Sequence, residues 1–334
     1  MTTFTNTSEK GLEALIERWL VDHNYYERGT NSDYNKEYAV DETRLFRFLQ
    51  DTQPDSMRRL GVFSSEQKKR KFLNRLSGEL AKRGVIDVLR NGVKVYPVDL
   101  VMFYLTPSPN NAKAVEMFDK NIFSVTRQLR YSQDASKLAL DMCIFINGLP
   151  VITMELKNQL TKQNTDDAVR QYMDDRDPRE TLFSFKRCMV HFAVDDVTIK
   201  FCTKLAKKDS WFLPFNKGYN DGAGNPPNPN GLMTDYLWKD ILTKRKLARI
   251  IENYAQVVVD IDPDTGKKTV KQIFPRYHQL DCVESILADV SRNGIGKRYL
   301  IQHSAGSGKS NSIAWLAHQL ITLEQSGHPM IDSV

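Results

Sequence analysis

Residues Leu140–Asn158, LDMCIFINGLPVITMELKN, are the most informative segment for the fold of this chain. It holds two apolar runs, rich in Ile, Val, Met and Phe, on either side of Asn147-Gly148, the dipeptide that most strongly indicates a tight β-hairpin turn. Runs that are apolar at almost every position are typical of strands buried on both faces. The stretch therefore predicts two buried strands joined by a short turn.

Three charged residues interrupt this apolar hairpin. Asp141 lies in the first run, whereas Glu155 and Lys157, two residues apart, project from the same face of the second. Two carboxylates can bind a hard cation such as Mg²⁺ through oxygen, and a nearby ammonium can stabilise charge on a phosphate or orient a water. The competing interpretation, which the Glu-x-Lys triplet alone would favour, is a set of edge-strand charges or a salt-bridged pair.

The length of the turn decides whether the two carboxylates face the same way. A strict two-residue loop at Asn147-Gly148 would pair Asp141 with Met154, which puts Asp141 and Glu155 on opposite faces. One extra residue, either in a three-residue loop or in a bulge near Pro150, pairs the two acids on one face. We predict the longer connection.

Composition limits the class of protein. The 334 residues are 41% hydrophobic and 26% charged, which is typical of a globular chain with two domains, or with one domain and a fragment. The net charge of +6 permits a polyanionic partner without requiring one. Four scattered cysteines predict buried free thiols and no structural zinc. The start at Met1–Phe4 has no secretory pattern and no apolar stretch is long enough to cross a bilayer, so we expect a soluble, cytoplasmic protein without a membrane partner.

Periodicity places helices and strands in one mixed α/β unit. Apolar spacing predicts helices over 12–20, 43–49 and 69–80, and over 166–174 with Thr165 as the cap. Short β-rich runs lie at 85–89, 94–98, 123–125, 138–146, 151–156 and 188–193. A Gly-, Pro- and Asn-rich segment at 216–231 is either a flexible linker or an ordered loop that contacts another domain or a partner. A helix over 234–253 and a hairpin turning at 262–266 then lead to a second domain starting at Phe274.

A phosphate-binding loop is the second motif with chemical content. In His303–Ser310, HSAGSGKS, the glycines Gly306 and Gly308 flank Ser307 and allow backbone N–H groups to face phosphate oxygens. Lys309 can reach terminal phosphates and Ser310 can hold Mg²⁺. The run 299–302 reads as a buried strand and 311–320 as an amphipathic helix, which is the context that such a loop requires. The competing interpretation is a glycine turn with a chance lysine.

Several short segments of this sequence resemble the motor (restriction) subunit of type I restriction enzymes. They are the hairpin stretch above and DAVRQY at 167–172, LPFNKG at 213–218, GAGNPP at 222–227 and FPRYHQ at 274–279. The resemblance implies a PD-(D/E)xK nuclease in which Asp141 and Glu155 bind the metal and Lys157 is the catalytic lysine. It also places Gln171 where relatives carry a Gln-x-x-x-Tyr motif, although the residue four positions later is Asp175. An acid of the first helix, Glu13 by position, either faces the metal or is a solvated helix charge.

The same resemblance implies the domain order. A PD-(D/E)xK endonuclease domain with a mixed central sheet flanked by helices is expected over 1–200, a connecting segment over 201–273, and the truncated start of a RecA-like, superfamily 2 ATPase over 274–334. Gln279 resembles the helicase glutamine that recognises adenine. Because the chain stops before an acidic strand or an arginine finger, it should not turn ATP over.

The implied activity is magnesium-dependent hydrolysis of DNA phosphodiester bonds, coupled in the whole subunit to ATP-driven translocation. The implied partners are double-stranded DNA and the methyltransferase and specificity subunits of the restriction complex. Basic runs at Arg58-Arg59, 68–71 and 204–208 are either phosphate contacts or solvated helix faces. Two rival functions are a non-cleaving DNA-binding or docking module and a plain P-loop ATPase with an unrelated leading domain.

Overall fold

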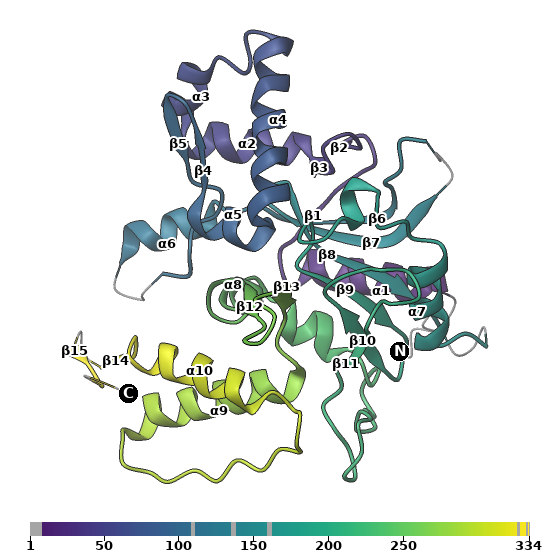
Figure 1. Ribbon diagram of the computed structural model, residues 1–334, viewed down its shortest axis with the longest axis vertical. Coiled ribbons are helices and arrows are strands. Elements are labelled where there is room, and N and C mark those ends of the chain that lie inside the picture. Colours follow the sequence, from purple (N-terminus) through teal and green to yellow (C-terminus); the bar gives the residue numbers. More distant parts are fainter. Residues whose placement is uncertain are drawn as a thin grey trace.

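A mixed seven-stranded sheet forms the centre of the molecule, with helices packed on it (Figure 1). The structure is a computed structural model that describes residues 9–107, 111–134, 138–158, 162–325, 328–331 and 333. The expected start of the chain at Met1–Phe4 lies outside these residues. The expectation of a mixed α/β fold with a central sheet flanked by helices is confirmed.

The sheet is built around the predicted hairpin. Its strand order is β1-β6-β7-β8-β9-β10-β11, in which β1 runs parallel to β6, β8 runs parallel to β9, and all other neighbours are antiparallel. The strands are β1 Glu27–Arg28, β6 Phe123–Arg130, β7 Ala139–Ile146, β8 Leu149–Leu156, β9 Val190–Val194, β10 Ile199–Cys202 and β11 Leu213–Pro214. Every residue of β8 is buried, as expected for a strand covered on both faces.

Two helices cover opposite faces of this sheet. Helix α1 (Glu9–Asp22) contributes Leu12, Ile16 and Leu20 to the larger core, together with the inward side chains of β8 such as Met154. Helix α7 (Thr165–Asp174) lies on the other face and places Tyr172 in a second, smaller core. The apolar spacing on each helix is the reason for its position, because a single apolar stripe is buried against the sheet.

A helical arm projects from one end of the sheet (Figure 1). It consists of helices α2 Glu42–Thr52, α3 Pro54–Leu60, α4 Glu66–Arg83 and α5 Val85–Asn91, with the hairpin of β4 Val93–Val95 and β5 Val98–Leu100. Beside it lie the short pair β2 Tyr34–Asn35 and β3 Val40–Asp41, and helix α6 Ala112–Asp119. The helices predicted over 43–49 and 69–80 are confirmed.

The β-rich reading of residues 85–89 is wrong, because this segment forms helix α5. Its buried residues Val85, Ile86, Val88 and Leu89 follow the i, i+1, i+3, i+4 spacing that puts side chains on one face of a helix. The preceding Gly84 has a φ of 87° and separates α5 from α4. The β-branched composition of this segment suggested a strand, whereas the spacing of its apolar residues indicated a helix.

The cap of helix α7 is Asn164, not Thr165. The Asn164 side chain accepts from the backbone N–H of Asp166 at 2.8 Å and of Asp167, whose carboxylate in turn accepts from the Asn164 N–H at 2.8 Å. The hydroxyl of Thr165 is used elsewhere, donating to Asp195 Oδ2 at 2.8 Å. Either residue type can cap a helix, so only the tertiary contact decides between them.

The segment after the sheet differs in part from expectation. The helix expected over 234–253 is split into a short π-helix, η3 Leu237–Ile241, and helix α8 Lys244–Asn253. The segment 216–231 is an ordered loop, held by bonds such as Gly218 N to Gly224 O at 2.8 Å and Asn225 Nδ2 to Asn216 Oδ1 at 3.0 Å. The hairpin turning at 262–266 is confirmed between β12 Gln256–Ile261 and β13 Lys268–Ile273.

The last part of the chain contains helices α9 Tyr277–Asn293 and α10 Lys309–Leu320 and the short pair β14 Glu324–Gln325 and β15 His328–Pro329. The buried strand expected at 299–302 is absent, and Leu300 is 94% exposed. A strand needs neighbours for its backbone N–H and C=O groups, and among the described residues none lies beside this segment. Within the described part of the chain, no helix is long and apolar enough to span a membrane.

Candidate active site

A bulge in the central hairpin brings Asp141 opposite Glu155. The turn itself has two residues, because Ile146 pairs with Leu149, so the three-residue alternative is wrong. The register then shifts by one residue beside Pro150, after which Met142 pairs with Met154. The next residues along the two strands are Asp141 and Glu155, so the predicted longer connection is confirmed in its bulged form. Asp141 Oδ2 accepts from the backbone N–H of Leu156 at 2.8 Å.

Gly148 is required at the turn for two reasons. Its φ of 80° lies in the left-handed region, where a side chain is disfavoured. A Cβ at this position would also lie 2.4 Å from the backbone oxygen of Asp41, whose N–H donates to Gly148 O at 2.8 Å. The turn that sets the register of the carboxylates is therefore held against the start of α2.

Glu155 is a fully buried carboxyl paired with an arginine. Arg176, which follows α7, donates from Nε to Glu155 Oε1 at 2.5 Å and is itself held by Tyr131 Oη at 3.1 Å and Ala139 O at 2.8 Å. Burial and the neighbouring Asp141 raise the pKa of Glu155 to about 8, and Arg176 and Lys157 partly offset this rise. Among the described residues, Glu155 Oε2 has no hydrogen-bond partner although it is buried.

Gln128 links Asp141 to the first helix. Its Nε2 donates to Asp141 Oδ1 at 3.2 Å and to Glu13 Oε1 at 2.8 Å, while Arg127 Nε donates to Glu13 Oε2 at 3.2 Å. Gln128 has a φ of 48° inside β6, an uncommon conformation for a non-glycine residue. This local distortion turns its side chain towards the two acids.

Glu13 is therefore joined to Asp141 through the Gln128 amide, and its interpretation as a solvated helix charge is wrong. The side chain is 2% exposed. Burial, followed by the negative charge of Asp141, raises the pKa of Glu13, against the lowering effect of Arg127.

Lys157 and Gln171 lie on different elements of the fold. Lys157 comes directly after β8, is 7% exposed, and donates its backbone N–H to Val194 O at 2.9 Å. Gln171 is half-buried on α7, and among the described residues its side chain makes no hydrogen bond. The neighbouring Tyr172 is buried instead, with its hydroxyl 2.8 Å from Thr153 Oγ1, two residues before Glu155 on the same strand face.

The carboxylates of Asp141 and Glu155 suit a hard cation only if water molecules complete its coordination. In the described part of the chain, no three His, Cys, Asp or Glu side chains are gathered closely enough to hold a metal ion. Mg²⁺ usually keeps several waters and binds one or two carboxylates, which Asp141 and Glu155 can provide. The buried Glu155 Oε2 without a partner is the observation that fits a cation, because a buried carboxylate oxygen is costly when left without one.

Sequence reasoning missed Gln128 and Arg176, which hold Asp141 and Glu155. Neither lies near the acids in sequence, since Gln128 is 13 residues from Asp141 and Arg176 is 21 residues from Glu155. The available signal for Arg176 was a charged residue just after an amphipathic helix that packs on the strand. No pattern in the sequence indicated the left-handed backbone of Gln128.

The glycine-rich loop at 303–310 precedes helix α10 as expected. Gly306 and Gly308 have φ values of 71° and 84°, and α10 begins at Lys309. The Lys309 Nζ donates to the loop carbonyls of Ser304 at 2.9 Å and His303 at 3.2 Å. Ser307 is buried, whereas Ser310 is exposed at the start of the helix. The loop thus presents the first turn of a twelve-residue helix.

Gln279 is brought directly to this loop. Its Nε2 donates to Gly308 O at 2.8 Å, and its Oε1 accepts from the backbone N–H of Arg276 at 2.9 Å. A Cβ on Gly308 would lie 2.5 Å from Gln279 Nε2, so the glycine is needed for this approach. Both ends of the amide are engaged within the protein, which makes Gln279 a residue that positions the loop.

Comparison with known proteins points to one family. The family model described as "Type I restriction enzyme R protein N terminus" matches residues 6–210. A relative from Methanocaldococcus jannaschii, named "Putative type I restriction enzyme MjaVIIIP endonuclease subunit", is 23% identical over 268 residues, covering 78% of this chain and 24% of its own length. The "Type I restriction enzyme HindI endonuclease subunit" of Haemophilus influenzae is 25% identical over 299 residues, covering 81% of this chain and 27% of its own. The chain thus spans about a quarter of the length of these curated relatives.

Proposed function

Because the chain belongs to the type I restriction enzyme R protein family, whose N-terminal region matches residues 6–210, we propose that it carries the DNA-cleaving site of such an enzyme. The proposed reaction is magnesium-dependent hydrolysis of a phosphodiester bond in double-stranded DNA by a PD-(D/E)xK centre. The observation that carries this proposal is the bulged register, which sets Asp141 opposite Glu155. Without the bulge the two acids would face opposite sides of the sheet.

Each residue of the centre has a proposed role. Asp141 and Glu155 would hold Mg²⁺, and Lys157 would stabilise negative charge on the scissile phosphate. Bound there, the cation supplies Lewis-acid charge at the phosphate. Gln128 and Glu13 keep the Asp141 carboxylate in place through the Gln128 amide. Arg176 holds one oxygen of Glu155 and leaves the other to the cation. Gln171 is proposed to approach the DNA.

Metal removal tests this proposal directly. We expect the chain to nick supercoiled plasmid slowly in Mg²⁺ or Mn²⁺. Cleavage should stop completely in excess EDTA, because the carboxylates are negative and cannot replace the positive charge of the cation. Gel electrophoresis of timed samples measures the rate, and re-addition of the metal should restore it. Cleavage that continues in EDTA would rule out a metal-dependent centre, and no cleavage with any divalent cation would favour the docking module.

We further propose that the loop His303–Ser310 binds the phosphates of ATP. The support is the pair of left-handed glycines before a helix start, where backbone N–H groups and the helix dipole favour an anion. Lys309 now donates to two loop carbonyls and would exchange them for phosphate oxygens. Ser310, exposed beside it, would bind the accompanying Mg²⁺. Gln279 would act through the loop, since its amide is already engaged.

Nucleotide binding can be measured without turnover. A fluorescent ATP analogue is expected to bind the chain weakly, and Lys309→Ala should lower the affinity by about tenfold or more because a hydrogen bond to a charged phosphate is lost, at ~1.5–3 kcal/mol. The matched control is Lys297→Ala, which removes a lysine paired with Asp289 away from the loop. Equal binding by both variants would mean that the loop does not bind nucleotide.

The same family membership supports partners for the whole protein. We propose that the complete subunit works with methyltransferase and specificity subunits, which would supply recognition of the DNA sequence, and couples cleavage to translocation by a superfamily 2 ATPase. In this proposal the nuclease domain spans 1–200, the connecting segment 201–273 and the start of the ATPase 274–334. The sheet itself continues to β11 at Leu213–Pro214, so strand pairing crosses the first limit.

A further inference from the structure

In the helical arm, whose helices α3 and α4 lie away from β8 in Figure 1, there is a basic cleft. It has a volume of about 580 Å³ and is formed by α3, α4 and the β4–β5 hairpin. Five of its lining side chains are cationic, namely Arg59, Lys68, Lys71, Arg75 and Lys94, and none of its lining residues is acidic. We call this set the arm cleft.

The arm cleft is built by helical spacing and by a docked hairpin. Lys68, Lys71 and Arg75 are three and four residues apart, so they lie along one side of α4. Arg75 Nε donates to Lys94 O at 3.2 Å, and Arg59 Nη2 donates to Pro97 O at 3.4 Å. The two arginines therefore fasten the hairpin to the helices and bring Lys94 beside the lysines of α4.

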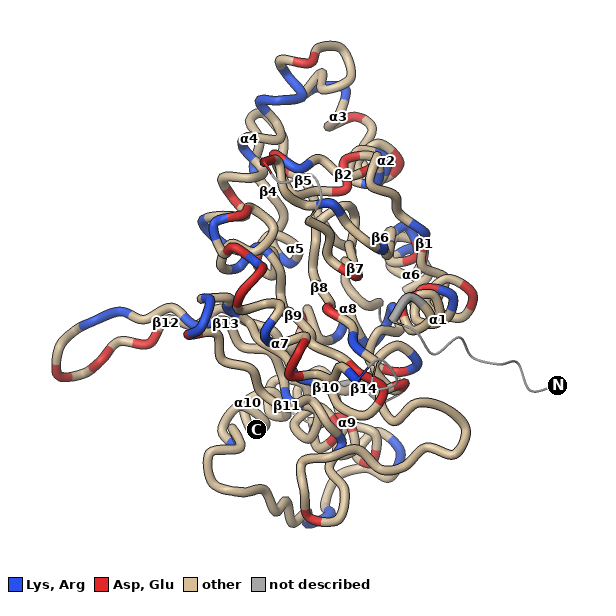
Figure 2. The backbone as a smooth tube through the Cα atoms, turned by 90° about the vertical axis from the view of Figure 1, so that its right-hand side faces the viewer, with Lys and Arg blue, Asp and Glu red and all other residues tan. Residues whose placement is uncertain are grey.

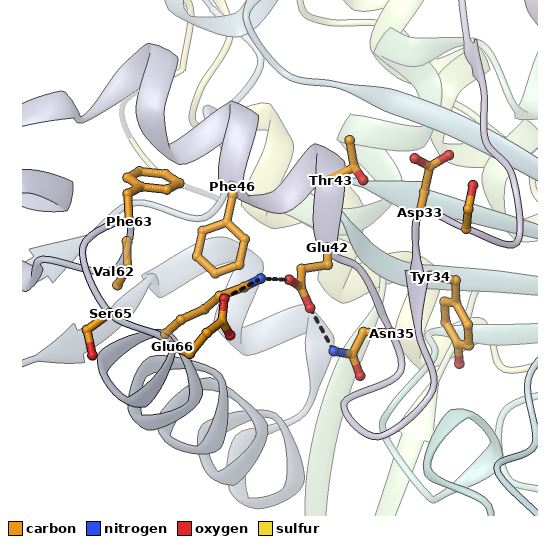
Figure 3. A pocket seen from close by; sticks show the side chains of 12 residues that line it. Asp33, Tyr34, Asn35, Glu42, Thr43, Phe46, Val62, Phe63, Ser65 and Glu66 are labelled. Carbon is orange, nitrogen blue, oxygen red and sulfur yellow. Dashed lines mark hydrogen bonds and ion pairs between the residues drawn. The ribbon is translucent and has the colours of Figure 1, made fainter.

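On the opposite side of α4 the basic side chains are paired with carboxylates, and Figure 3 shows the pocket on that side. There Lys69 pairs with Glu42 and lies 3.9 Å from Glu66, while Arg70 lies 3.3 Å from Glu37. The pocket of about 520 Å³ on that side is lined by three carboxylates as well as Lys69. The positive charges of that side are thus neutralised within the protein.

On the cleft side, among the described residues, this neutralisation is limited to Arg75. Arg75 pairs with Glu79 at 2.9 Å, but Lys68, Lys71 and Lys94 have no ion pair among the described residues. All three are exposed, and Lys and Arg are concentrated along this part of α4 (Figure 2). Clustered like charges repel one another, so the cluster does not stabilise the fold, and a polyanion would offset the repulsion.

We propose that the arm cleft binds the phosphate backbone of duplex DNA outside the cleavage site. This inference rests on the proposed function, which supplies DNA as the substrate. A duplex fits better than a single strand, because single-strand grooves stack successive bases on several aromatic rings. The cleft offers one exposed ring, Tyr96, which is 97% exposed, whereas Phe72 is buried. Such contacts would hold DNA on the arm without reading its sequence.

The test is equilibrium binding of a short fluorescent duplex to the 334-residue chain over a range of salt concentrations, in EDTA so that the DNA stays intact. The variant Lys68→Gln/Lys71→Gln is expected to lower the affinity by about tenfold or more at ~0.1 M salt. It should also reduce the slope of log K against log salt by about 2, since each lost phosphate contact removes about one unit. Both lysines are exposed, so the fold should be unaffected.

The matched control removes the same charge elsewhere. Lys267→Gln/Lys268→Gln alters two exposed lysines at the β12–β13 hairpin and should change the slope much less. If the cleft variant and this control bind alike while the parent chain binds duplex, the arm cleft is wrong and the proposed function stands. If the parent chain binds no DNA, the proposed function fails first and the cleft with it.

Two further outcomes would also overturn the assignment. Tighter binding of single-stranded DNA that is lost in Tyr96→Ala would make the cleft a base-stacking groove. Displacement of the duplex by inorganic phosphate at matched ionic strength would make it a site for a small anion. Retained duplex preference together with weak competition by phosphate is the result expected for a backbone-binding cleft.

Discussion

Single-turnover cleavage of plasmid DNA by the Lys157→Ala variant is expected to be about 100- to 1000-fold slower than cleavage by the parent chain. Removal of one group that stabilises charge in the transition state typically has an effect of about this size. Lys157 comes directly after β8 and is 7% exposed, and its charge lowers the pKa of Glu155, so it lies near this carboxyl in a place where charge is weakly screened. The measurement is the rate of conversion of supercoiled to nicked plasmid with protein in excess.

The control for this prediction is Lys268→Ala, which removes an exposed lysine of the β12–β13 hairpin and should cleave at the parent rate. The folded state of Lys157→Ala should be confirmed by its thermal transition, so that a slow rate reflects chemistry. A Lys157→Ala chain that folds and cleaves as fast as the control would remove this lysine from the mechanism.

Asp141→Asn is the companion variant that separates binding of the cation from chemistry. The amide oxygen can still accept from the N–H of Leu156, so the hairpin register should survive. The lost negative charge should raise the metal concentration needed for half-maximal cleavage, whereas Lys157→Ala should leave that concentration unchanged and lower the maximal rate. The same metal dependence in both variants would contradict the roles assigned to the two residues.

Replacing Arg176 with methionine is expected to lower the free energy of unfolding by about 3–5 kcal/mol near pH 9. Removal of one partner of a buried ion pair leaves the other charge uncompensated, and losses of this size are typical. Arg176 and Glu155 are 3% and 0% exposed at their side chains. Chemical denaturation in EDTA, at pH 6 and at pH 9, measures the effect without a bound cation.

The pH dependence has a definite sign. The pKa of Glu155 in the folded chain, about 8, lies above the ordinary value of 4.5, so between these two values the folded chain holds a proton that the unfolded chain releases. Stability should therefore fall as the pH rises from about 4.5 to 8. Arg176 is one of the groups that oppose the rise of this pKa, so its loss should extend the window above pH 8 and make the defect smaller at pH 6.

The double variant Glu155→Gln/Arg176→Met supplies the control. It removes both charges, so it should be more stable than Arg176→Met at pH 9, and it should lose the part of the pH dependence that belongs to Glu155. A single and a double variant with equal stability at pH 9 would show that the pair is not coupled. In that case, a packing defect at Tyr131 would explain the loss.

Local patterns were sufficient for the central hairpin and for the glycine turn before α10. The continuous apolar runs on both sides of Asn147-Gly148 predicted β7 and β8, and the requirement that both acids share a face predicted an extra residue near Pro150. The glycines Gly306 and Gly308 predicted the turn before α10. These features follow from the residue type at a fixed spacing, which is information that a sequence contains.

Patterns were insufficient where two structures suit the same residues. The run Val85–Leu89 is β-branched in composition but helical in spacing, and packing of the arm made it α5. The segment 299–302 has strand composition, but no described strand pairs with it. Asn164 and Thr165 can both cap α7, and the contact of Thr165 with Asp195 decided between them.

The amino-acid pattern was enough to identify the charged residues inside an apolar hairpin, the position of its turn, and the family to which the chain belongs. The groups that hold those charges became known from the folded chain: Gln128 contacts Asp141 and Glu13, and Arg176 contacts Glu155. Spacing along a strand sets the direction of its own side chains, whereas the partners of a buried charge come from elements that meet only when the sheet and its helices pack together.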